Sequence, residues 1–129
     1  MQYGVPRRGV PSAASFRRWI EGEVTVRIVG AREGRLLNLR FRGRGKPTNV
    51  LSFPYGRGRG DIVLCHPVVA REARAQGKSL AAHYAHLAVH GSLHLRGYDH
   101  VKKKDARRME EAEIRVLRRL GFANPYELE

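Results

Sequence analysis

The segment from Leu80 to about Leu95 constrains the fold more than any other part of the chain. Ser79 is a suitable N-cap for a helix here, and Gly97 is a suitable C-terminal stop. A surface helix has one apolar stripe, whereas this helix would be apolar around most of its circumference, so it should lie at the centre of the fold. Its apolar arc consists of Leu80, Tyr84, Leu87, Ala88 and Leu95, with Val89 and Leu93 outside the arc.

Histidines occupy the remaining face of this helix. His90 and His94 are one helical turn apart, so their imidazoles can bind one metal ion. Gly97 can adopt a positive φ, which would let the chain leave the helix and bring His100 back as a third ligand. The spacing HxxxHxxGxxH therefore predicts one Zn²⁺ per chain, held by His90, His94 and His100.

Three imidazole ligands would leave one position of a tetrahedral zinc open for water, which is typical of catalytic sites. Zinc can lower the pKa of bound water from about 15.7 to about 7. His86 lies about 12 Å from His94 along the helix axis, so we expect it to orient a ligand or face the substrate. His83 and His66 are expected to be surface or packing residues.

Two reactions fit a three-histidine zinc site in this sequence. The spacing is that of metzincin metalloproteases, but Gly91 stands where those enzymes carry their general base, a glutamate. Asp99 is the candidate acid or base that remains in the motif, and its alternative role is to orient a ligand imidazole. Phosphodiester cleavage instead needs a metal and a cation that together stabilise charge on the phosphate oxygens.

The chain carries a strong excess of basic residues. It has 25 Lys and Arg residues against 12 Asp and Glu residues, which gives a net charge of +13. Such a charge favours nucleic acid or an anionic membrane surface as a partner. The alternative is that the charge only keeps the protein soluble. Between Gly34 and Gly60 there are seven basic residues and no acidic residue. This stretch is rich in glycine and strand-like, so it does not resemble an amphipathic helix that binds a membrane. These seven residues are Arg35, Arg40, Arg42, Arg44, Lys46, Arg57 and Arg59.

A second basic cluster, which runs from Arg96 to Arg108, flanks the histidine motif and favours a polyanion bound beside the metal. The alternation of Leu37, Leu39 and Phe41 with polar residues predicts a strand over Leu37–Arg42. In such a strand Arg42 would point away from the core and could contact the scissile phosphate. The residues predicted to bind RNA are Arg40, Arg44, Lys46, Arg57, Arg59 and His86.

The remaining patterns predict strands in the first half of the chain and helices in the second. This order indicates an α+β fold in a single domain over residues 1–129, with a small mixed four-stranded sheet packed by about four to five helices. Further strands are expected at Val24–Val29, Val50–Phe53 and Asp61–Cys65, and a short strand near Tyr3. We expect a turn at Gly43–Lys46, a loop at Tyr55–Gly60, and helices over Ala13–Gly22, from Pro67 to Gly77 and over Lys102–Leu120.

Cys65 is the only cysteine, so no intramolecular disulfide can form. The first residues contain no apolar segment of the kind that a signal peptide has, and no run approaches the ~20 apolar residues of a membrane span. We therefore expect a cytoplasmic protein that makes no contact with a membrane.

Four segments resemble the bacterial YbeY-type endoribonucleases, the rRNA maturation factors. They are HGSLHLRGYDH at His90–His100, TNVLSFP at Thr48–Pro54, GDIVLC at Gly60–Cys65 and LGFANPY at Leu120–Tyr126. The likeness runs from about Phe16 to Tyr126, and the histidine motif combined with TNVLSFP is highly specific.

The resemblance implies a zinc-dependent, single-strand-specific endoribonuclease in 16S rRNA 3′-end maturation, ribosome biogenesis and ribosome quality control. It implies zinc ligation by His90, His94 and His100, a catalytic role for Arg42, and no small-molecule cofactor. The implied partners are rRNA, the small ribosomal subunit and other ribosome-associated proteins. Either water or the neighbouring 2′-hydroxyl could be the nucleophile. The alternatives are a metzincin-like metalloprotease and a non-catalytic rRNA-binding assembly factor with structural zinc.

Overall fold

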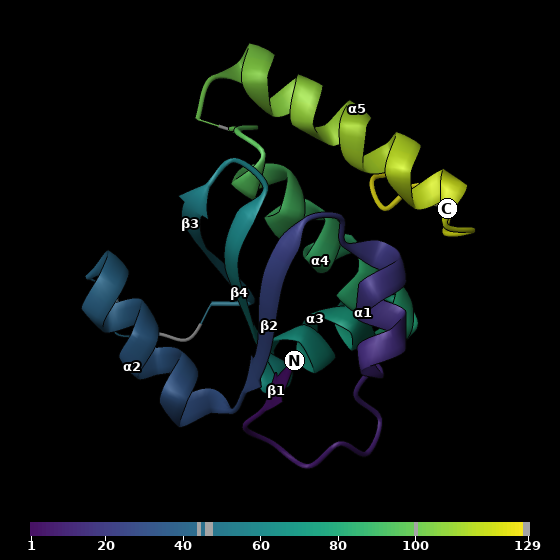
Figure 1. The fold of residues 1–129 in the computed structure, drawn as a ribbon. Coiled ribbons are helices and arrows are strands. Elements are labelled where there is room, and N and C mark those ends of the chain that lie inside the picture. The colour runs from purple at the N-terminus through teal and green to yellow at the C-terminus, as the bar shows by residue number, and fades with distance from the viewer. Residues whose placement is uncertain (44, 46–47, 100, 128–129) are drawn as a thin grey trace.

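A four-stranded mixed sheet forms the middle of the computed structural model, which describes residues 1–43, 45, 48–99 and 101–127. The strand order is β1-β2-β4-β3, with β1 and β2 parallel, β2 and β4 parallel, and β3 and β4 antiparallel. Five helices pack around the sheet within the described residues (Figure 1). The elements are β1 (Gln2–Tyr3), α1 (Ala13–Trp19), β2 (Glu23–Val29), α2 (Ala31–Arg42), β3 (Val50–Gly56), β4 (Arg59–Cys65), α3 (His66–Gln76), α4 (Leu80–Leu95) and α5 (Lys103–Arg119).

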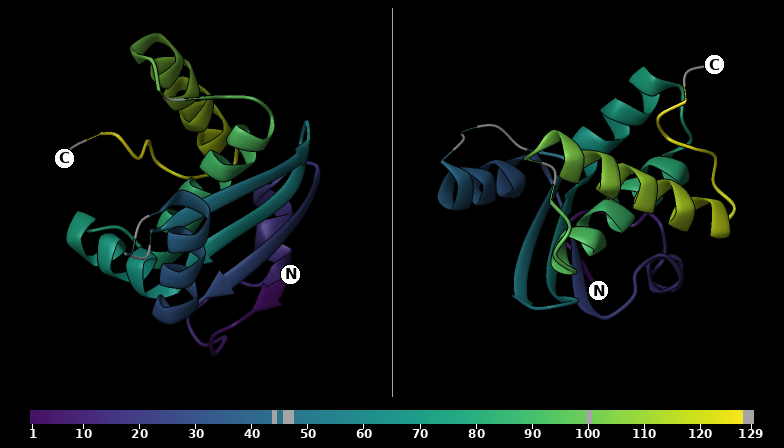
Figure 2. Two further views of the ribbon diagram at one scale, coloured as in Figure 1. Left: turned by 90° about the vertical axis from the view of Figure 1, so that its left-hand side faces the viewer. Right: turned by 90° about the horizontal axis from the view of Figure 1, so that it is seen from above.

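Helices cover both faces of the sheet. One face carries Ile28, Ile62 and Leu64, which pack against α1, α4 and α5 in the larger core cluster. The other face carries Val63 and Cys65 in a smaller cluster, against which Leu37 of α2 packs. Seen from above, α2 accordingly lies on one side of the strands, and α4 and α5 lie on the other (Figure 2). This arrangement confirms the predicted α+β class with a small mixed sheet.

Helix α4 lies at the centre of the larger cluster, as its composition predicts. Ser79 caps it by accepting a hydrogen bond from the Ala82 N–H at 3.1 Å. Val89 and Leu93, which lie outside the predicted apolar arc, are also buried, because α4 contacts the sheet, α1 and α5 at once. The predicted boundaries of this helix are confirmed.

The predicted strand over Leu37–Arg42 is wrong, because this segment forms the C-terminal half of helix α2. The helix ends at Gly43, whose φ of +69° suits a glycine, and whose N–H donates to Leu39 O at 3.0 Å. Helical spacing reverses the expected burial: Asn38 is buried, while Leu39 and Phe41 are 50% and 55% exposed. A six-residue alternation was too short to exclude a helix.

The predicted loop over Tyr55–Gly60 is mostly part of a hairpin. Strand β3 extends to Gly56 and β4 begins at Arg59, so only Arg57 and Gly58 form the turn, and the pairing shifts between Pro54 and Gly56. The Gly58 N–H donates to Leu95 O at 2.8 Å. The hairpin turn is thereby fixed to the C-terminal end of α4.

The other predicted elements appear with small shifts. Helix α1 ends at Trp19 rather than Gly22, and α5 begins one residue later and ends one residue earlier than expected. Helix α3 has Pro67 in its first turn and ends at Gly77, as predicted. Within the described ranges, each helix is too short or too polar to cross a membrane.

Candidate metal centre and active site

The histidine face of α4 meets acidic residues from two neighbouring helices. His83 is 3% exposed, and its Nε2 lies 3.0 Å from Glu72 Oε1 of α3. Further along the same face, His86 and His90 contact Glu113 of α5. His90 and His94 are only partly buried. The face thus runs from a buried end at His83 to a more accessible end at His94.

His90 and His94 form the predicted pair. Their ring centroids are 4.8 Å apart and their ring planes are inclined by 80°. The pair forms because residues four apart on a helix project from the same side. Two imidazoles so placed can provide two ligands to one metal ion.

Glu113 of α5 contacts one member of this pair, His90, and also His86. Its carboxylate is 1% exposed and lies 2.9 Å from His90 Nδ1 and 2.7 Å from His86 Nε2. The Tyr126 hydroxyl donates to the same carboxylate at 2.6 Å. Because Glu113 contacts Nδ1 of His90, Nε2 is the atom through which His90 would coordinate a metal. A carboxylate behind a ligand histidine is the usual support of a zinc site.

The surroundings of Glu113 keep it ionised. Burial raises the pKa of this carboxyl, but hydrogen bonds from His86, His90 and Tyr126 outweigh burial and lower the pKa to about 2. Burial and the contact with Glu113 raise the pKa of Tyr126, so its hydroxyl stays a donor. An ionised carboxylate only accepts hydrogen bonds, so both histidine nitrogens that face Glu113 carry protons.

The chain leaves α4 as the glycine in the motif predicts. Gly97 has a φ of +99°, and the N–H groups of Gly97 and Tyr98 donate to His94 O and Leu93 O at 3.0 and 3.1 Å. These bonds form a Schellman motif. Asp99 is exposed, and its Oδ1 accepts a hydrogen bond from the Val101 N–H at 3.2 Å.

His100 lies outside the described residues, so its role as third ligand stays a prediction. Within the described ranges, no group of three or more His, Cys, Asp and Glu is close enough together to hold a metal ion. The donor set nevertheless fits zinc, since His90 and His94 are neighbours and a buried carboxylate orients His90.

Arg57, one of the predicted RNA-binding residues, lies beside the histidine motif. The hairpin turn brings it beside His94 and Gly97, where it lines a surface hollow with both residues. It also lines an adjoining hollow with Asp99 and Arg108. Arg59 lies at the start of β4, where its Nε is 3.1 Å from Glu23 Oε2 in an exposed ion pair.

The other predicted RNA-binding residues are more scattered. Arg40 and Arg42 are exposed in the last turn of α2, and the Arg40 guanidinium lies 5.5 Å from the Phe41 ring centroid. Because this segment is a helix, Arg42 does not have the side-chain direction expected of a strand residue. Arg44 and Lys46 lie outside the described residues.

His86 is largely buried in the described structure. Its side chain is 13% exposed, and its Nε2 is bonded to Glu113, while Tyr126 packs edge-on against its ring at 5.4 Å. This geometry favours the first of its two expected roles, the orientation of the metal site. Contact with RNA stays a prediction for this residue.

Gly91 follows His90 directly, at the position where metzincins carry their glutamate, and it faces the sheet. A Cβ at this position would lie 3.0 Å from Ser52 Oγ and 3.1 Å from Ile62 Cδ1. Glycine therefore allows α4 to approach the sheet closely. A glutamate here would have to place its carboxylate against Ile62, which is fully buried.

Sequence reasoning missed the acidic partners of the histidines. Glu113 lies among the apolar residues of α5, next to Ala112 and one turn from Met109, and an acid in such a stripe signals a buried, paired charge. Asn49 of the TNVLSFP segment was also missed: its Nδ2 donates to Glu72 at 3.0 Å. Glu72 thereby links this segment to His83.

Comparison with known proteins identifies the family. The family model described as "Endoribonuclease YbeY" matches residues 10–121. The chain belongs to this family. It is 47% identical to the Endoribonuclease YbeY of Stenotrophomonas maltophilia (strain R551-3) and 48% identical to that of Xanthomonas axonopodis pv. citri (strain 306). Each match covers 98% of this chain and 91% of the relative.

A solved structure shares the fold of this YbeY family member. The solution structure of a Thermotoga maritima protein matches with a TM-score of 0.56 at 23% identity, over 98% of both chains. The resemblance drawn from the histidine motif and TNVLSFP is thus confirmed at the level of the family.

Proposed function

We propose that this protein is a zinc-dependent, single-strand-specific endoribonuclease that matures the 3′ end of 16S rRNA and acts in ribosome biogenesis and quality control. The observation that carries the proposal is the His90–His94 pair with Glu113 behind it. The relatives support the reaction class, because they are named endoribonucleases.

The zinc site would consist of His90, His94 and His100, one ion per chain. When bound, zinc would supply Lewis-acid catalysis of phosphodiester cleavage. Glu113 keeps the proton of His90 on Nδ1 and so fixes the tautomer that coordinates through Nε2. Tyr126 and His86 keep the carboxylate in position by hydrogen bonding to it.

Arg42 and Asp99 are the proposed catalytic residues besides the ligands. Arg42 would stabilise the negative charge that grows on the phosphate oxygens. Asp99 would act as acid or base, or orient the His100 imidazole. RNA would approach along Arg57, which adjoins His94, and along the further cations Arg40, Arg44, Lys46 and Arg59.

The proposed partners are rRNA and the small ribosomal subunit, with other ribosome-associated proteins, in the cytoplasm. The net charge of +13 supports the polyanionic partners among them.

We predict that binding to single-stranded RNA weakens steeply with salt, because each cation that neutralises a phosphate releases a counterion, with a log–log slope of about −0.7 per contact. Fluorescence anisotropy between 50 and 300 mM salt measures this slope. An affinity that does not change with salt would contradict an electrostatic RNA-binding surface.

Gly91 argues against the metalloprotease alternative. The glutamate that a metzincin needs as its general base has no space at this position, where a Cβ already lies 3.0 Å from Ser52 Oγ. Other candidate bases in the motif would have to replace it. The second alternative, a non-catalytic rRNA-binding factor with structural zinc, differs from the proposal in its products, so end-mapping separates the two.

The deciding experiment incubates purified protein with a small-subunit rRNA precursor that carries an unprocessed 3′ end. We expect discrete new ends in the single-stranded 3′ region, lost on chelation and in the His94→Ala variant. Intact precursor that is bound at high affinity would support the non-catalytic assembly factor instead. Cleavage of an unstructured peptide would support the protease.

A further inference from the structure

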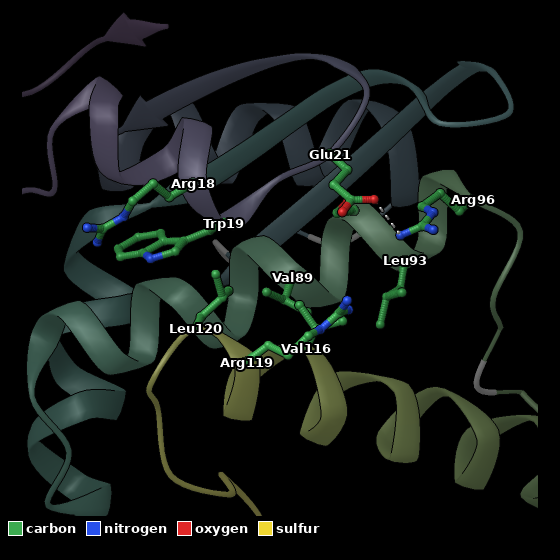
Figure 3. A pocket seen from close by; sticks show the side chains of 10 residues that line it. Arg18, Trp19, Glu21, Val89, Leu93, Arg96, Val116, Arg119 and Leu120 are labelled. Atoms are coloured by element: carbon green, nitrogen blue, oxygen red, sulfur yellow. Dashed lines mark ion pairs between the residues drawn. The ribbon is translucent and has the colours of Figure 1, made fainter.

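A pocket on the other side of α4 is not used by the proposed RNA cleavage. It lies between α1, α4 and α5, has a volume of about 330 Å³, and is lined by five apolar residues and by the polar residues Arg18, Glu21, Ser92, Arg96 and Arg119 (Figure 3). Such a volume lies within the range of binding pockets for small groups. The apolar lining residues are Trp19, Val89, Leu93, Val116 and Leu120.

Arginines surround the opening of this pocket. In Figure 3, Arg18 and Arg96 stand at opposite ends, and the guanidinium of Arg119 lies between them. Arg96 Nη1 is 3.7 Å from Glu21 Oε2, a long and exposed ion pair. Within the described part of the chain, Arg18 and Arg119 make no ion pair. The rim therefore has excess positive charge along its length.

The indole of Trp19 forms one wall of the pocket. Trp19 is 5% exposed, and its Nε1 is buried with no hydrogen-bond partner among the described residues. Because this nitrogen is itself shielded from solvent, Trp19 contributes apolar ring surface to the pocket rather than a donor for its occupant.

The pocket opens on a different side of α4 from the histidine face, although Arg96 at its rim also lines the hollow beside His94. Around the helix, Leu93 points about 60° away from His90 and about 100° away from His94, because each residue advances about 100°. The pocket also lacks the features of an RNA site. Trp19 packs against Phe16 and Phe122 at ring-centroid distances of 5.3 and 5.9 Å and is only 5% exposed, so its ring is not available to stack on a base.

We propose that this pocket binds an acidic segment of a partner protein, with one apolar side chain on the aliphatic floor. Arginines spread along the rim can pair with successive carboxylates, whereas a single small anion would contact only one of them. An apolar floor with a charged rim is the usual composition of a protein-binding patch. The proposal does not depend on RNA cleavage.

The test uses the full chain and a panel of fluorescein-labelled 12-residue peptides, each with one Leu, Ile or Phe flanked by Asp and Glu. We expect a subset to bind in anisotropy titrations. Arg119→Glu and Arg18→Glu should each weaken binding about tenfold or more, since reversing a rim charge turns attraction into repulsion. The matched control is Arg118→Glu, a neighbour on α5 that does not line the pocket, and it should bind like the parent.

Two control peptides test the parts of the pocket separately. Exchange of the apolar peptide residue for Ser, or of the acidic peptide residues for Lys, should abolish binding. The protein variants Arg18→Glu and Arg119→Glu should both cleave RNA at the parental rate. The proposal is overturned if no acidic peptide binds, or if Arg118→Glu weakens binding as much as Arg119→Glu. It is also overturned if Arg119→Glu instead lowers the affinity for a single-stranded RNA 12-mer, which would make the pocket an RNA site.

Discussion

At the scale of single residues, the carboxylate of Glu113 contacts Nδ1 of His90 and would determine how this histidine binds a metal. It accepts hydrogen bonds from His90, His86 and Tyr126 in a buried position. We predict that Glu113→Gln lowers zinc affinity about 10–100-fold, as expected for loss of a carboxylate behind a ligand histidine. It should also lower the free energy of unfolding by about 1–3 kcal/mol, because an amide cannot satisfy three donors. Competition with a chromophoric chelator measures the zinc affinity.

Glu110→Gln is the matched control, because Glu110 is on the exposed side of the same helix. Its zinc affinity should equal that of the parent. Tyr126→Phe removes one donor of the three and should have a smaller effect than Glu113→Gln. Parental zinc affinity in Glu113→Gln would show that the carboxylate does not support the metal site.

The proximity of His90 and His94 could be predicted from sequence, but the contact of His90 with Glu113 could not. His90 and His94 are four residues apart on one helix, so spacing alone brings them together. Glu113 is 23 residues from His90 and meets it only because α5 packs on α4. The one available signal was an acid in the apolar stripe of α5.

At the scale of elements, the long helices could be predicted and α2 could not. Helix α4 has an N-cap residue, a glycine after its C-terminus and a helical pattern of apolar residues over sixteen positions. Together these signals predict both the helix and its ends. In α2, the buried positions are Gly34 and Asn38, neither of which is apolar, while Leu36 and Leu39 are exposed. Helical periodicity in this segment is therefore hidden, and the short alternation favours a strand.

The close packing of α4 on the sheet can be tested at Gly91. We predict that Gly91→Ala lowers the free energy of unfolding by about 1–3 kcal/mol, the usual cost of overpacking a core. The reason is the contact of the new Cβ with Ser52 and Ile62 at 3.0–3.1 Å. Urea denaturation measures the change. Gly45→Ala is the control, since a Cβ there meets nothing within 4 Å. Equal stability of the two variants would exclude close packing at Gly91.

The end of α2 carries the proposed catalytic arginine. If Arg42 stabilises the transition state, Arg42→Ala should cut the single-turnover cleavage rate by about 10²–10³-fold at saturating RNA, with zinc content unchanged. Arg42→Lys should restore only part of the rate, because an ammonium cannot form the two-pronged contact with phosphate. Arg32→Ala, at the other end of α2, should cleave like the parent. A parental rate in Arg42→Ala would reduce Arg42 to a phosphate anchor.

At the scale of the whole molecule, the order of the elements predicted the fold class, but strand pairing could not be predicted. Strands β2 and β4 pair in parallel although α2 and β3 lie between them in sequence. Their short apolar runs mark both as buried strands but do not identify their partners. The hairpin turn also reaches α4 through a contact between Gly58 and Leu95, 37 residues apart, which no local pattern indicates.

The central claim is that RNA cleavage depends on one zinc ion held by His90, His94 and His100. The most direct measurement is the cleavage rate of metal-free protein as zinc is added in substoichiometric steps. We predict that the rate rises linearly and reaches a plateau at one zinc per chain, since three imidazoles complete one open tetrahedral site. His90→Ala, His94→Ala and His100→Ala should each stay inactive and lack stoichiometric zinc by elemental analysis. Undiminished cleavage by the metal-free protein, or full zinc occupancy with parental activity in His100→Ala, would contradict it.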